Sequence, residues 1–220
     1  MSQPVCVIPA RMSSSRFPGK PLVPLLGLPL VLHVYERCKL YSRFRDIIVA
    51  TCDEEIRQAV VAHGGQAVMT ADSHERATDR VQEAVESLYP DMDESGIIVM
   101  IQGDELLVSP DMISQVIEVQ RNTGAPVINF GSRLEAEDHD DPNTVKVVAA
   151  PDGRVLYFSR APIPSSSRVR NVPIYQQTGI MAFTFGFLDH FAKLPQTPLE
   201  IIESVDMNRL IENRYKIKMV

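Results

Sequence analysis

The sequence predicts an α/β fold in which a mixed, mostly parallel sheet is flanked by helices, with an antiparallel hairpin inserted in its second half. Short apolar runs typical of buried strands alternate with amphipathic segments through the first half of the chain. Two apolar runs in the second half are joined by Pro151-Asp152-Gly153, a turn sequence suited to a hairpin. The 220 residues can also bury a substantial core as one domain.

Strands and helices alternate in the first half. Continuous apolar runs indicate strands that are buried on both faces, and apolar residues that recur every three or four positions indicate amphipathic helices. Gly64-Gly65 ends one such helix, and Ser109 before Pro110 is the N-cap signal of another. The predicted elements are strands at residues 5–8, 46–51, 66–70 and 96–101 and helices at residues 53–63, 78–88 and 110–120.

The second half is richer in strands. The runs at 144–149 and 154–159 form the predicted hairpin, and a proline- and serine-rich stretch at 161–173 indicates irregular structure. Apolar residues at helical spacing predict one helix over 198–213. Further strands are expected at residues 127–132, 179–184 and 215–220. No internal repeat or linker divides the sequence, so residues 1–220 are expected to form a single domain.

Charge and composition exclude several classes of function. The net charge of −6 argues against a generic nucleic-acid binder, because phosphate-backbone binding rests on a basic surface. The three cysteines and five histidines show neither zinc-ligand spacing nor a disulfide framework. No cationic leader opens the sequence, and the apolar stretch at 21–34 is interrupted by Pro24, Gly27 and Pro29. We therefore expect a cytoplasmic protein without a membrane or nucleic-acid partner.

A basic loop follows the first predicted strand. The run Ile8-Pro9-Ala10-Arg11-Met12-Ser13-Ser14-Ser15-Arg16-Phe17-Pro18-Gly19-Lys20-Pro21-Leu22 gathers cations and hydroxyls in a segment whose proline and glycine content prevents regular structure. Guanidinium, ammonium and backbone N–H groups suit a polyphosphate, and open α/β sheets bind ligands at such strand ends. The alternative is an ordinary solvated surface loop.

Two common nucleotide-binding motifs do not match this loop. A Walker A loop requires glycine and a serine or threonine at the positions that Ser14 and Pro21 occupy. No Gly-x-Gly-x-x-Gly follows the first strand, which disfavours an NAD-dependent dehydrogenase. The loop therefore predicts an anion site of another type.

An acidic group follows the central predicted strand. The apolar residues 97–101 run directly into Gln102-Gly103-Asp104-Glu105. A carboxylate at the carboxyl end of a buried strand suits a hard cation such as Mg²⁺, although Asp104 and Glu105 could instead cap the next loop. Together with the basic loop, Asp104 predicts a nucleotide–magnesium site.

Five motifs carry a family resemblance over nearly the whole chain. They are the basic loop, Ile48-Val49-Ala50-Thr51, Gln102-Gly103-Asp104-Glu105, Val145-Lys146-Val147-Val148 and Leu156-Tyr157-Phe158-Ser159-Arg160-Ala161-Pro162-Ile163-Pro164. On these motifs the chain resembles the sugar-nucleotide cytidylyltransferases, and among them the CMP-Kdo synthetase family, where Kdo is 3-deoxy-manno-octulosonate. The resemblance implies a Rossmann-like fold of the nucleotide-diphospho-sugar transferase type. It divides the chain into a nucleotide-binding part, residues 1–125, and a sugar-binding and dimerisation part, residues 126–220.

The resemblance also implies a reaction and its residues. The anomeric hydroxyl of an acidic 3-deoxy sugar attacks the α-phosphate of CTP and releases pyrophosphate, for lipopolysaccharide or capsule precursors. The implied cofactor is Mg²⁺ on Asp104, the partners are CTP and an acidic sugar, and the assembly is a homodimer. The implied catalytic residues are Arg11, Lys20 and Asp104. The implied nucleotide-binding residues are Pro9, Ala10, Arg11, Ser14, Arg16, Lys20, Arg76, Thr78, Asp79, Arg80 and Gln102, and the sugar-binding residues are Gln102, Arg160, Gln177 and Asp206.

The sequence departs from the family pattern at four places. Arg76-Ala77 replaces Ser-Gly in the run His-x-Ser-Gly-Thr-Asp-Arg, Gln177 replaces a histidine, and Asp206-Met207-Asn208-Arg209 replaces Glu-Gln-Leu-Arg. These changes alter donors and acceptors near the base and the sugar, so we expect a shifted acceptor preference. The family's second magnesium-binding aspartate lies beyond Val220, so we expect weak or absent activity of the 220-residue chain.

Other interpretations remain open on the sequence alone. One is a cytidylyltransferase for a nonulosonic acid such as sialic acid, or another nucleotide-sugar pyrophosphorylase, although those families carry more glycine or lysine in the first loop. Another is a catalytically silent relative that binds a nucleotide or sugar without forming a product. The apolar segments at 155–158 and 181–187 can likewise belong to a dimer interface or to the core.

Overall fold

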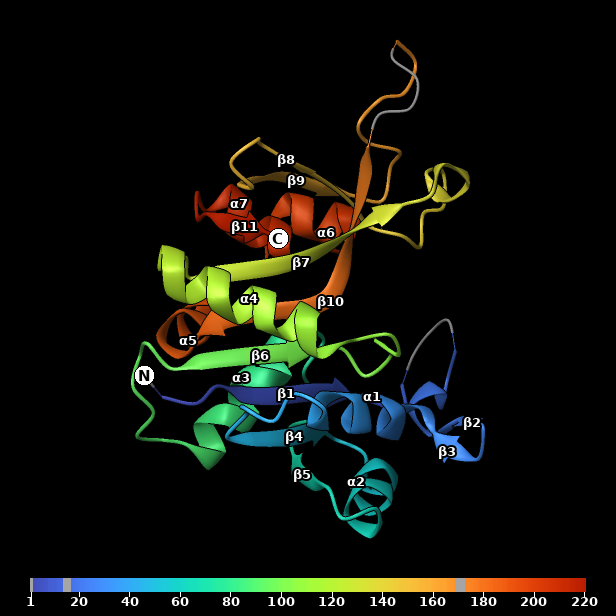
Figure 1. Ribbon diagram of the computed structural model, residues 1–220, viewed down its shortest axis with the longest axis vertical. Coiled ribbons are helices and arrows are strands. Elements are labelled where there is room, and N and C mark those ends of the chain that lie inside the picture. Colours follow the sequence, from blue (N-terminus) through green and yellow to red (C-terminus); the bar gives the residue numbers. More distant parts are fainter. Residues whose placement is uncertain (1, 14–16, 169–172) are drawn as a thin grey trace.

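A computed structural model describes residues 2–13, 17–168 and 173–220, and it has the predicted α/β architecture (Figure 1). Within the described residues, nine strands form the main sheet, with the order β11-β7-β10-β6-β1-β4-β5 and with β8 and β9 branching from β10. The strands of this sheet are β1 (Val5–Ala10), β4 (Asp46–Thr51), β5 (Gln66–Met69), β6 (Ile97–Ile101), β7 (Val127–Leu134), β8 (Lys146–Ala149), β9 (Val155–Ser159), β10 (Ile174–Thr184) and β11 (Ile217–Met219). A separate small hairpin consists of β2 (Pro24–Leu25) and β3 (Leu28–Pro29).

Helices cover both faces of the main sheet. They are α1 (Leu30–Lys39), α2 (Glu54–Ala62), α3 (Ala77–Leu88), α4 (Pro110–Thr123), α5 (Phe185–Lys193), α6 (Pro198–Glu203) and α7 (Met207–Glu212), with short 3₁₀ turns η1 (Lys20–Leu22) and η2 (Ala136–Asp138). On β1, Cys6 and Ile8 belong to the core shared with α1, α2 and α4, whereas Val5 and Val7 belong to the core shared with α3, α5 and α7. Alternation along one strand thus supplies both cores. Among the described helices, none has both the length and the apolar character that crossing a membrane requires.

Strand directions bring distant segments to one edge of the sheet. β1 pairs in parallel with β4 and β6, and β4 pairs in parallel with β5. β10 is antiparallel to both β6 and β7, so it runs from the edge at which β1 and β6 end. The predicted hairpin is confirmed as the antiparallel pair β8–β9. Residues from both halves of the chain therefore meet at the carboxyl ends of β1 and β6.

The prediction of one helix over 198–213 is wrong. α6 ends at Glu203, Ser204 has a φ of 52°, and α7 begins only at Met207. A residue in the left-handed region cannot continue a right-handed helix, so the chain changes direction at Ser204. The apolar spacing persists across this break, which explains why the pattern suggested a single helix.

Two helices and part of a strand were not predicted. α1 begins directly after Pro29, within the apolar stretch whose breaks had ruled out a membrane span, and α5 follows β10 without an intervening loop. β10 itself begins at Ile174, earlier than expected. Phe158, Met181 and Phe183 are buried in the core of this single chain, so the two apolar segments contribute mainly to the core.

The cap predicted for the helix at 110 is confirmed. Ser109 precedes α4, and its hydroxyl oxygen accepts a hydrogen bond from the backbone N–H of Met112 at 3.4 Å. This bond satisfies one of the first-turn donors that lack a partner within the helix. α4 consequently starts at the predicted residue and covers β7 and β10 (Figure 1).

Candidate functional site

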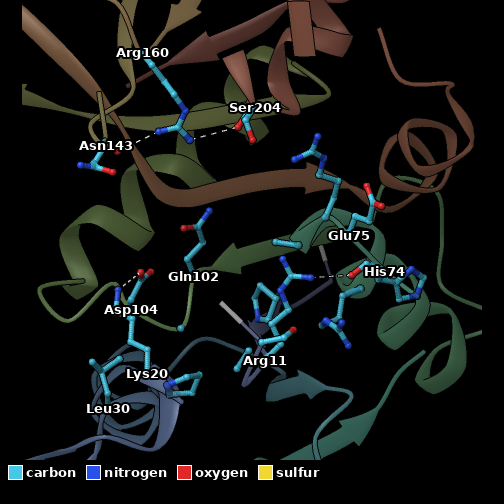
Figure 2. A pocket seen from close by; sticks show the side chains of 18 of the residues that line it. Arg11, Lys20, Leu30, His74, Glu75, Gln102, Asp104, Asn143, Arg160 and Ser204 are labelled. Atoms are coloured by element: carbon cyan, nitrogen blue, oxygen red, sulfur yellow. Dashed lines mark hydrogen bonds and ion pairs between the residues drawn. The ribbon is translucent and has the colours of Figure 1, made fainter. Parts of the chain in front are cut away.

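A cavity of about 590 Å³ opens at the carboxyl ends of β1 and β6 (Figure 2). Its size lies within the range of small-molecule sites, roughly 300–1,000 Å³. One side, which we call the strand-end wall, consists of Arg11, Lys20, Gln102 and Asp104. The opposite side, the loop wall, consists of Pro142, Asn143, Arg160 and Ser204. The first turn of α3 lines the cavity between them.

The loop after β1 brings two cations to the strand-end wall. Arg11 directly follows β1, and its Nη1 donates to the backbone carbonyl of His74 at 3.3 Å. Lys20 opens the turn η1, and its Nζ lies 2.6 Å from Asp104 Oδ2. The Lys20 and Asp104 side chains are 37% and 44% exposed, so water screens their ion pair and it can be rearranged at little cost. Both cations are therefore available to an anionic ligand.

Two glycines allow the strand ends to approach each other. A Cβ atom on Gly103 would lie 3.1 Å from the carbonyl oxygen of Pro9, and a Cβ atom on Gly179 would lie 2.6 Å from Cβ of Gln102. The second distance is far shorter than any real Cβ contact, so only glycine lets Gln102 lie against β10. The backbone N–H of Gln102 also donates to the carbonyl of Gly179 at 2.9 Å. Glycine at 179 thereby fixes Gln102 on the cavity wall.

The two acidic residues after β6 have different environments. Asp104 is exposed on the cavity wall, whereas the Glu105 carboxylate accepts a hydrogen bond from the backbone N–H of Gly179. Burial raises the pKa of Glu105, and the neighbouring charge of Asp104 raises it further. Glu105 therefore stabilises the strand ends, and Asp104 is the carboxylate that faces a ligand.

Among the described residues, a metal ion at this cavity would need further ligands beside the Asp104 carboxylate. Within the described residues, no group of three or more histidine, cysteine, aspartate and glutamate side chains is arranged to hold a metal. In nucleotide sites Mg²⁺ usually keeps several waters and binds one or two carboxylates together with substrate phosphates. The exposed carboxylate of Asp104, ion-paired with Lys20 of the basic loop, fits that pattern.

The first turn of α3 forms the third side of the cavity. Arg76, Ala77 and Arg80 all line it. Arg80 is only 2% exposed, and its Nη1 donates to Thr70 Oγ1 and to the carbonyl of Ala71. Its buried Nη2 has no hydrogen-bond partner in the part of the chain that the structure describes. Arg80 thus holds an unused donor in a fixed position beside the cavity, where a ligand acceptor would satisfy it.

A buried charge cluster ties α3 to α6 and α7. Glu200 is fully buried and accepts hydrogen bonds from Nε and Nη2 of Arg209, each at 2.7 Å. Arg76 Nε lies 3.3 Å from Glu200 Oε1. Asp206 accepts a hydrogen bond from Thr78 Oγ1 at 3.0 Å, and burial raises the pKa of Asp206. These contacts hold the first turn of α3 against the second half of the chain.

Arg160 is held in the loop wall by backbone carbonyl groups. Its Nε donates to Glu203 at 2.8 Å, its Nη1 donates to Pro142 at 2.9 Å and to Asn143 at 3.4 Å, and its Nη2 donates to Ser204 at 3.4 Å (Figure 2). These carbonyl acceptors orient the guanidinium at the cavity wall. The loop wall therefore presents an oriented cation to the cavity.

The structure brings most of the predicted site residues to this cavity. Those that line it are Pro9, Ala10, Arg11, Lys20, Arg76, Arg80, Gln102, Asp104 and Arg160. Those that do not line it are Thr78, Asp79, Gln177 and Asp206. Ser14 and Arg16, which were also predicted, lie outside the described residues.

The four residues away from the lining have identifiable local roles. Thr78 is fully buried and bonds Asp206, so both side chains lie between α3 and α7 rather than on the cavity. Asp79 is partly buried, and burial raises the pKa of its carboxyl group. Gln177 lies within β10, where its backbone N–H donates to the carbonyl of Val145 at 2.9 Å. They were implied by matching positions in the family resemblance, and a position in a sequence does not determine the direction of its side chain.

Several lining residues were not predicted. Pro142 and Asn143 follow Asp141 in a turn-like sequence, which indicates a loop but not its neighbours. Ser204 reaches the cavity because the chain turns there between α6 and α7. His74 and Glu75 also line the cavity; they are the first two positions of the His-x-Ser-Gly-Thr-Asp-Arg run, whose later residues alone were predicted to bind the nucleotide.

Comparisons with known proteins agree with this geometry. The family model described as "Cytidylyltransferase" matches residues 5–217. A 3-deoxy-manno-octulosonate cytidylyltransferase of Thermodesulfovibrio yellowstonii is 41% identical, over 98% of this chain and 88% of that protein. An 8-amino-3,8-dideoxy-manno-octulosonate cytidylyltransferase of Shewanella pealeana is also 41% identical, over 97% of this chain and 87% of that protein.

A solved structure has the same fold. It is described as CMP:2-keto-3-deoxy-manno-octonic acid synthetase complexed with CTP, and it matches with a TM-score of 0.90 at 35% sequence identity. The match covers 100% of this chain and 89% of the other. The mixed, mostly parallel sheet with its antiparallel additions is therefore shared along the entire length of the chain.

Proposed function

Since the chain belongs to the cytidylyltransferase family of nucleotidyltransferases, we propose that it transfers CMP from CTP to the anomeric hydroxyl of a 3-deoxy-2-keto sugar acid, Kdo or a close relative. Pyrophosphate is the second product. The observation that carries the proposal is one cavity with solvent-accessible cations on the strand-end wall and an oriented guanidinium on the loop wall. The names of the octulosonate cytidylyltransferases support the choice of acceptor.

The strand-end wall binds the triphosphate. Arg11 and Lys20 neutralise charge on the phosphate oxygens, and Lys20 exchanges its partner Asp104 for a phosphate when CTP enters. The bond from the sugar oxygen to the α-phosphorus forms as the bond to the pyrophosphate oxygen breaks, and the proton of the anomeric hydroxyl passes to water. Nucleotidyl transfer of this kind depends on positioning and charge neutralisation, so no covalent enzyme intermediate is needed.

Asp104 is the residue that would hold a magnesium ion brought by the nucleotide. Its carboxylate is exposed on the cavity wall beside Lys20, so it is accessible to a cation that arrives with CTP. The bound ion supplies electrostatic stabilisation of the charge that develops on the transferring phosphate. Lys20, once released from Asp104, is then free to follow the phosphate oxygens.

The loop wall binds the sugar acid. Arg160 keeps its positive charge while carbonyl groups hold its guanidinium in place, which suits the recognition of a carboxylate. Gln102, the residue of the strand-end wall that is fixed against Gly179, supplies an amide that can bond a sugar hydroxyl. The acceptor therefore lies next to the α-phosphate rather than in a separate site.

Pyrophosphate release tests this proposal. The purified protein is given CTP and Mg²⁺ with Kdo, with 8-amino-3,8-dideoxy-manno-octulosonate or with sialic acid. We expect slow release with an octulosonate, consistent with the weak activity expected from the sequence, and none with sialic acid. Release that requires sialic acid, or CTP binding without any product, would contradict the proposal. If the acceptor preference is shifted, Kdo has no wide advantage over its relatives in competition.

Asp104→Asn is the matched variant for the metal. It preserves the size of the side chain while removing the charge, so metal-dependent release is expected to disappear. Asp91→Asn makes the same change at an exposed position away from the cavity and should leave the rate unchanged. Equal activity of the two variants would show that Asp104 does not bind the metal ion.

The proposal extends to assembly and setting. The activated sugar acid would serve lipopolysaccharide or capsule precursor synthesis in the cytoplasm, where CTP is made. A homodimer through the second half of the chain is supported by apolar side chains left exposed there: Ile201 is 59% exposed and Ile202 is 74% exposed on α6. Light scattering after gel filtration measures the mass of the assembly directly, and a monomer would contradict this part of the proposal.

A further inference from the structure

Lys146 on β8 has an unusual environment for a lysine. Its side chain is fully buried, and its Nζ donates to the backbone carbonyls of Asp141 at 2.7 Å, Thr144 at 2.8 Å and Arg160 at 2.6 Å. An ammonium group has three N–H donors, so these three carbonyls satisfy all of them. Burying an ammonium costs free energy even when it is hydrogen-bonded, so a fully buried lysine needs an explanation.

The three carbonyls belong to the two segments that form most of the loop wall. Asp141 and Thr144 enclose Pro142 and Asn143, which line the cavity, and Arg160 lines it from the end of β9. The Arg160 guanidinium donates back to the carbonyls of Pro142 and Asn143. Lys146 thus bonds the main chain of both segments on the buried side, while Arg160 joins them on the cavity side.

A second contact fixes the main chain of Arg160. Its backbone N–H donates to Glu203 Oε2 at 2.8 Å, and its carbonyl accepts from Lys146. Both main-chain groups of this residue are therefore bonded to charged side chains. The position of the guanidinium depends on these two bonds as well as on its own carbonyl partners.

We propose that Lys146 is a positioning residue for the acceptor: its ammonium group holds the 141–144 segment and the main chain of Arg160 so that the loop wall is formed before the sugar acid binds. This inference rests on the proposed function, because it assigns the loop wall to the acceptor. A loop wall that is already ordered loses less conformational entropy when the ligand binds. The effect of Lys146 therefore falls on acceptor affinity. CTP, which binds the strand-end wall, is not affected.

The charge state of Lys146 gives an independent readout. Burial lowers the pKa of Lys146, and the nearby Arg160 charge lowers it too, whereas Asp141, Asp140 and Glu203 raise it. Carboxylates and guanidinium groups in general keep their charge through the alkaline range, so the ammonium of Lys146 is the group here that loses a proton. Its neutral amine has two N–H donors for three carbonyls. As the pH rises, the KM for the acceptor should therefore increase, and this increase should begin at a lower pH than the titration of an ordinary lysine.

Lys146→Met is the direct test, with Lys193→Met as its control. Lys193 on α5 is 70% exposed and pairs with Asp189. Lys193→Met therefore makes the same change of charge and volume as Lys146→Met, but away from the loop wall. In the Lys146 variant we expect the acceptor KM to rise about tenfold or more, the usual cost of losing hydrogen bonds to a charged group. The kcat and the calorimetric CTP affinity should stay near wild type, and the alkaline rise in KM should disappear. The control should keep all wild-type values.

Each outcome decides between the inference and the proposed function. Wild-type turnover with an unchanged acceptor KM in Lys146→Met overturns the inference alone. A wild-type protein that releases no pyrophosphate with either octulosonate overturns the proposed function and this inference with it. If Lys146→Met does not fold, the pH profile of the wild-type protein decides. An acceptor KM that stays constant through the alkaline range overturns the inference. An acceptor KM that rises while the KM for CTP stays constant supports it.

Discussion

The two walls of the cavity hold their cations in different ways. On the strand-end wall, Lys20 is partly exposed and pairs with a partly exposed carboxylate, a contact that water screens. On the loop wall, Arg160 is bonded to several carbonyls and backed by the buried ammonium of Lys146. A triphosphate brings its own charge and metal, so cations that can move suit it. A sugar acid offers one carboxylate and directional hydroxyls, so a wall fixed in advance suits it better.

The largest expected effect tests whether buried charge stabilises the second half of the molecule. Glu200→Ala leaves the buried Arg209 without its carboxylate, and an uncompensated buried charge costs roughly 3–5 kcal/mol in unfolding free energy. Urea unfolding followed by circular dichroism measures it. The loss of Arg76's partner should also weaken the junction between α3 and α6.

Glu54→Ala is the control for that substitution. Glu54 forms an exposed ion pair with Arg57 on α2, so its removal should leave the urea midpoint close to wild type. If the two variants lose similar stability, the charge cluster around Glu200 does not stabilise the fold as we describe.

The next effect concerns rate rather than stability. Lys20→Met removes the cation that we propose acts on the transferring phosphate, so kcat/KM for CTP should fall on the order of 10²- to 10³-fold, as when one charge-stabilising donor is lost from an active site. The urea midpoint should not change, because the Lys20–Asp104 pair is screened by water. Pyrophosphate release and unfolding are measured on the same preparation, with Lys39→Met as the control. A large loss of stability in Lys20→Met would mean that the Lys20–Asp104 ion pair stabilises the fold, and the contrast between the two walls would then fail.

A smaller effect separates the two walls by ligand. Arg160→Met removes an oriented charge, so the acceptor KM should rise about tenfold to a hundredfold, the range for losing a hydrogen bond to a charged group. Calorimetry should show unchanged CTP affinity. An equal loss of affinity for CTP and acceptor would contradict the division of the cavity into two walls.

The smallest effect is a dependence of stability on acid pH. Burial alone would raise the pKa of Glu203, but hydrogen bonds from the Arg160 backbone, Ser159 and Tyr157 lower it below its ordinary value. The unfolded chain thus binds a proton more readily than the folded one. Glu203 therefore contributes stability above the unfolded-state pKa of about 4.5, and that contribution is lost as the pH falls through the lower folded-state value.

Glu203→Gln tests this origin. It should flatten the decline in unfolding free energy at acid pH, measured by urea titrations at successive pH values. An acid decline that keeps its wild-type slope in the variant would assign the proton uptake to other carboxylates.

Local signals in the sequence predicted the sheet better than the site. The strand at 46–51 and the cap at Ser109 follow from short patterns, and both agree with the structure. The break at Ser204 does not follow, because apolar spacing continues across a single left-handed residue. α1 was hidden among prolines that in fact lie before its first turn.

The residues of the strand-end wall could be predicted from the sequence because each lies in a short motif directly after a strand. Arg11, Lys20 and Asp104 lie in short motifs directly after strands, and parallel strands bring their carboxyl ends together. The loop wall is assembled from residues 142–143, 160 and 204, which only the antiparallel additions and the α6–α7 turn bring together. No sequence pattern marks Lys146 as buried, since its burial depends on three carbonyls from two other segments.

A crystal structure with Mg²⁺, a non-hydrolysable CTP analogue and the preferred octulosonate tests the central claim most directly. The account predicts the triphosphate against Arg11 and Lys20, with Lys20 released from Asp104, and the sugar carboxylate against Arg160. It also predicts that the 141–144 segment keeps its bonds to Lys146. A triphosphate bound by Arg160, or a sugar acid on the strand-end wall, would contradict the assignment of the two walls.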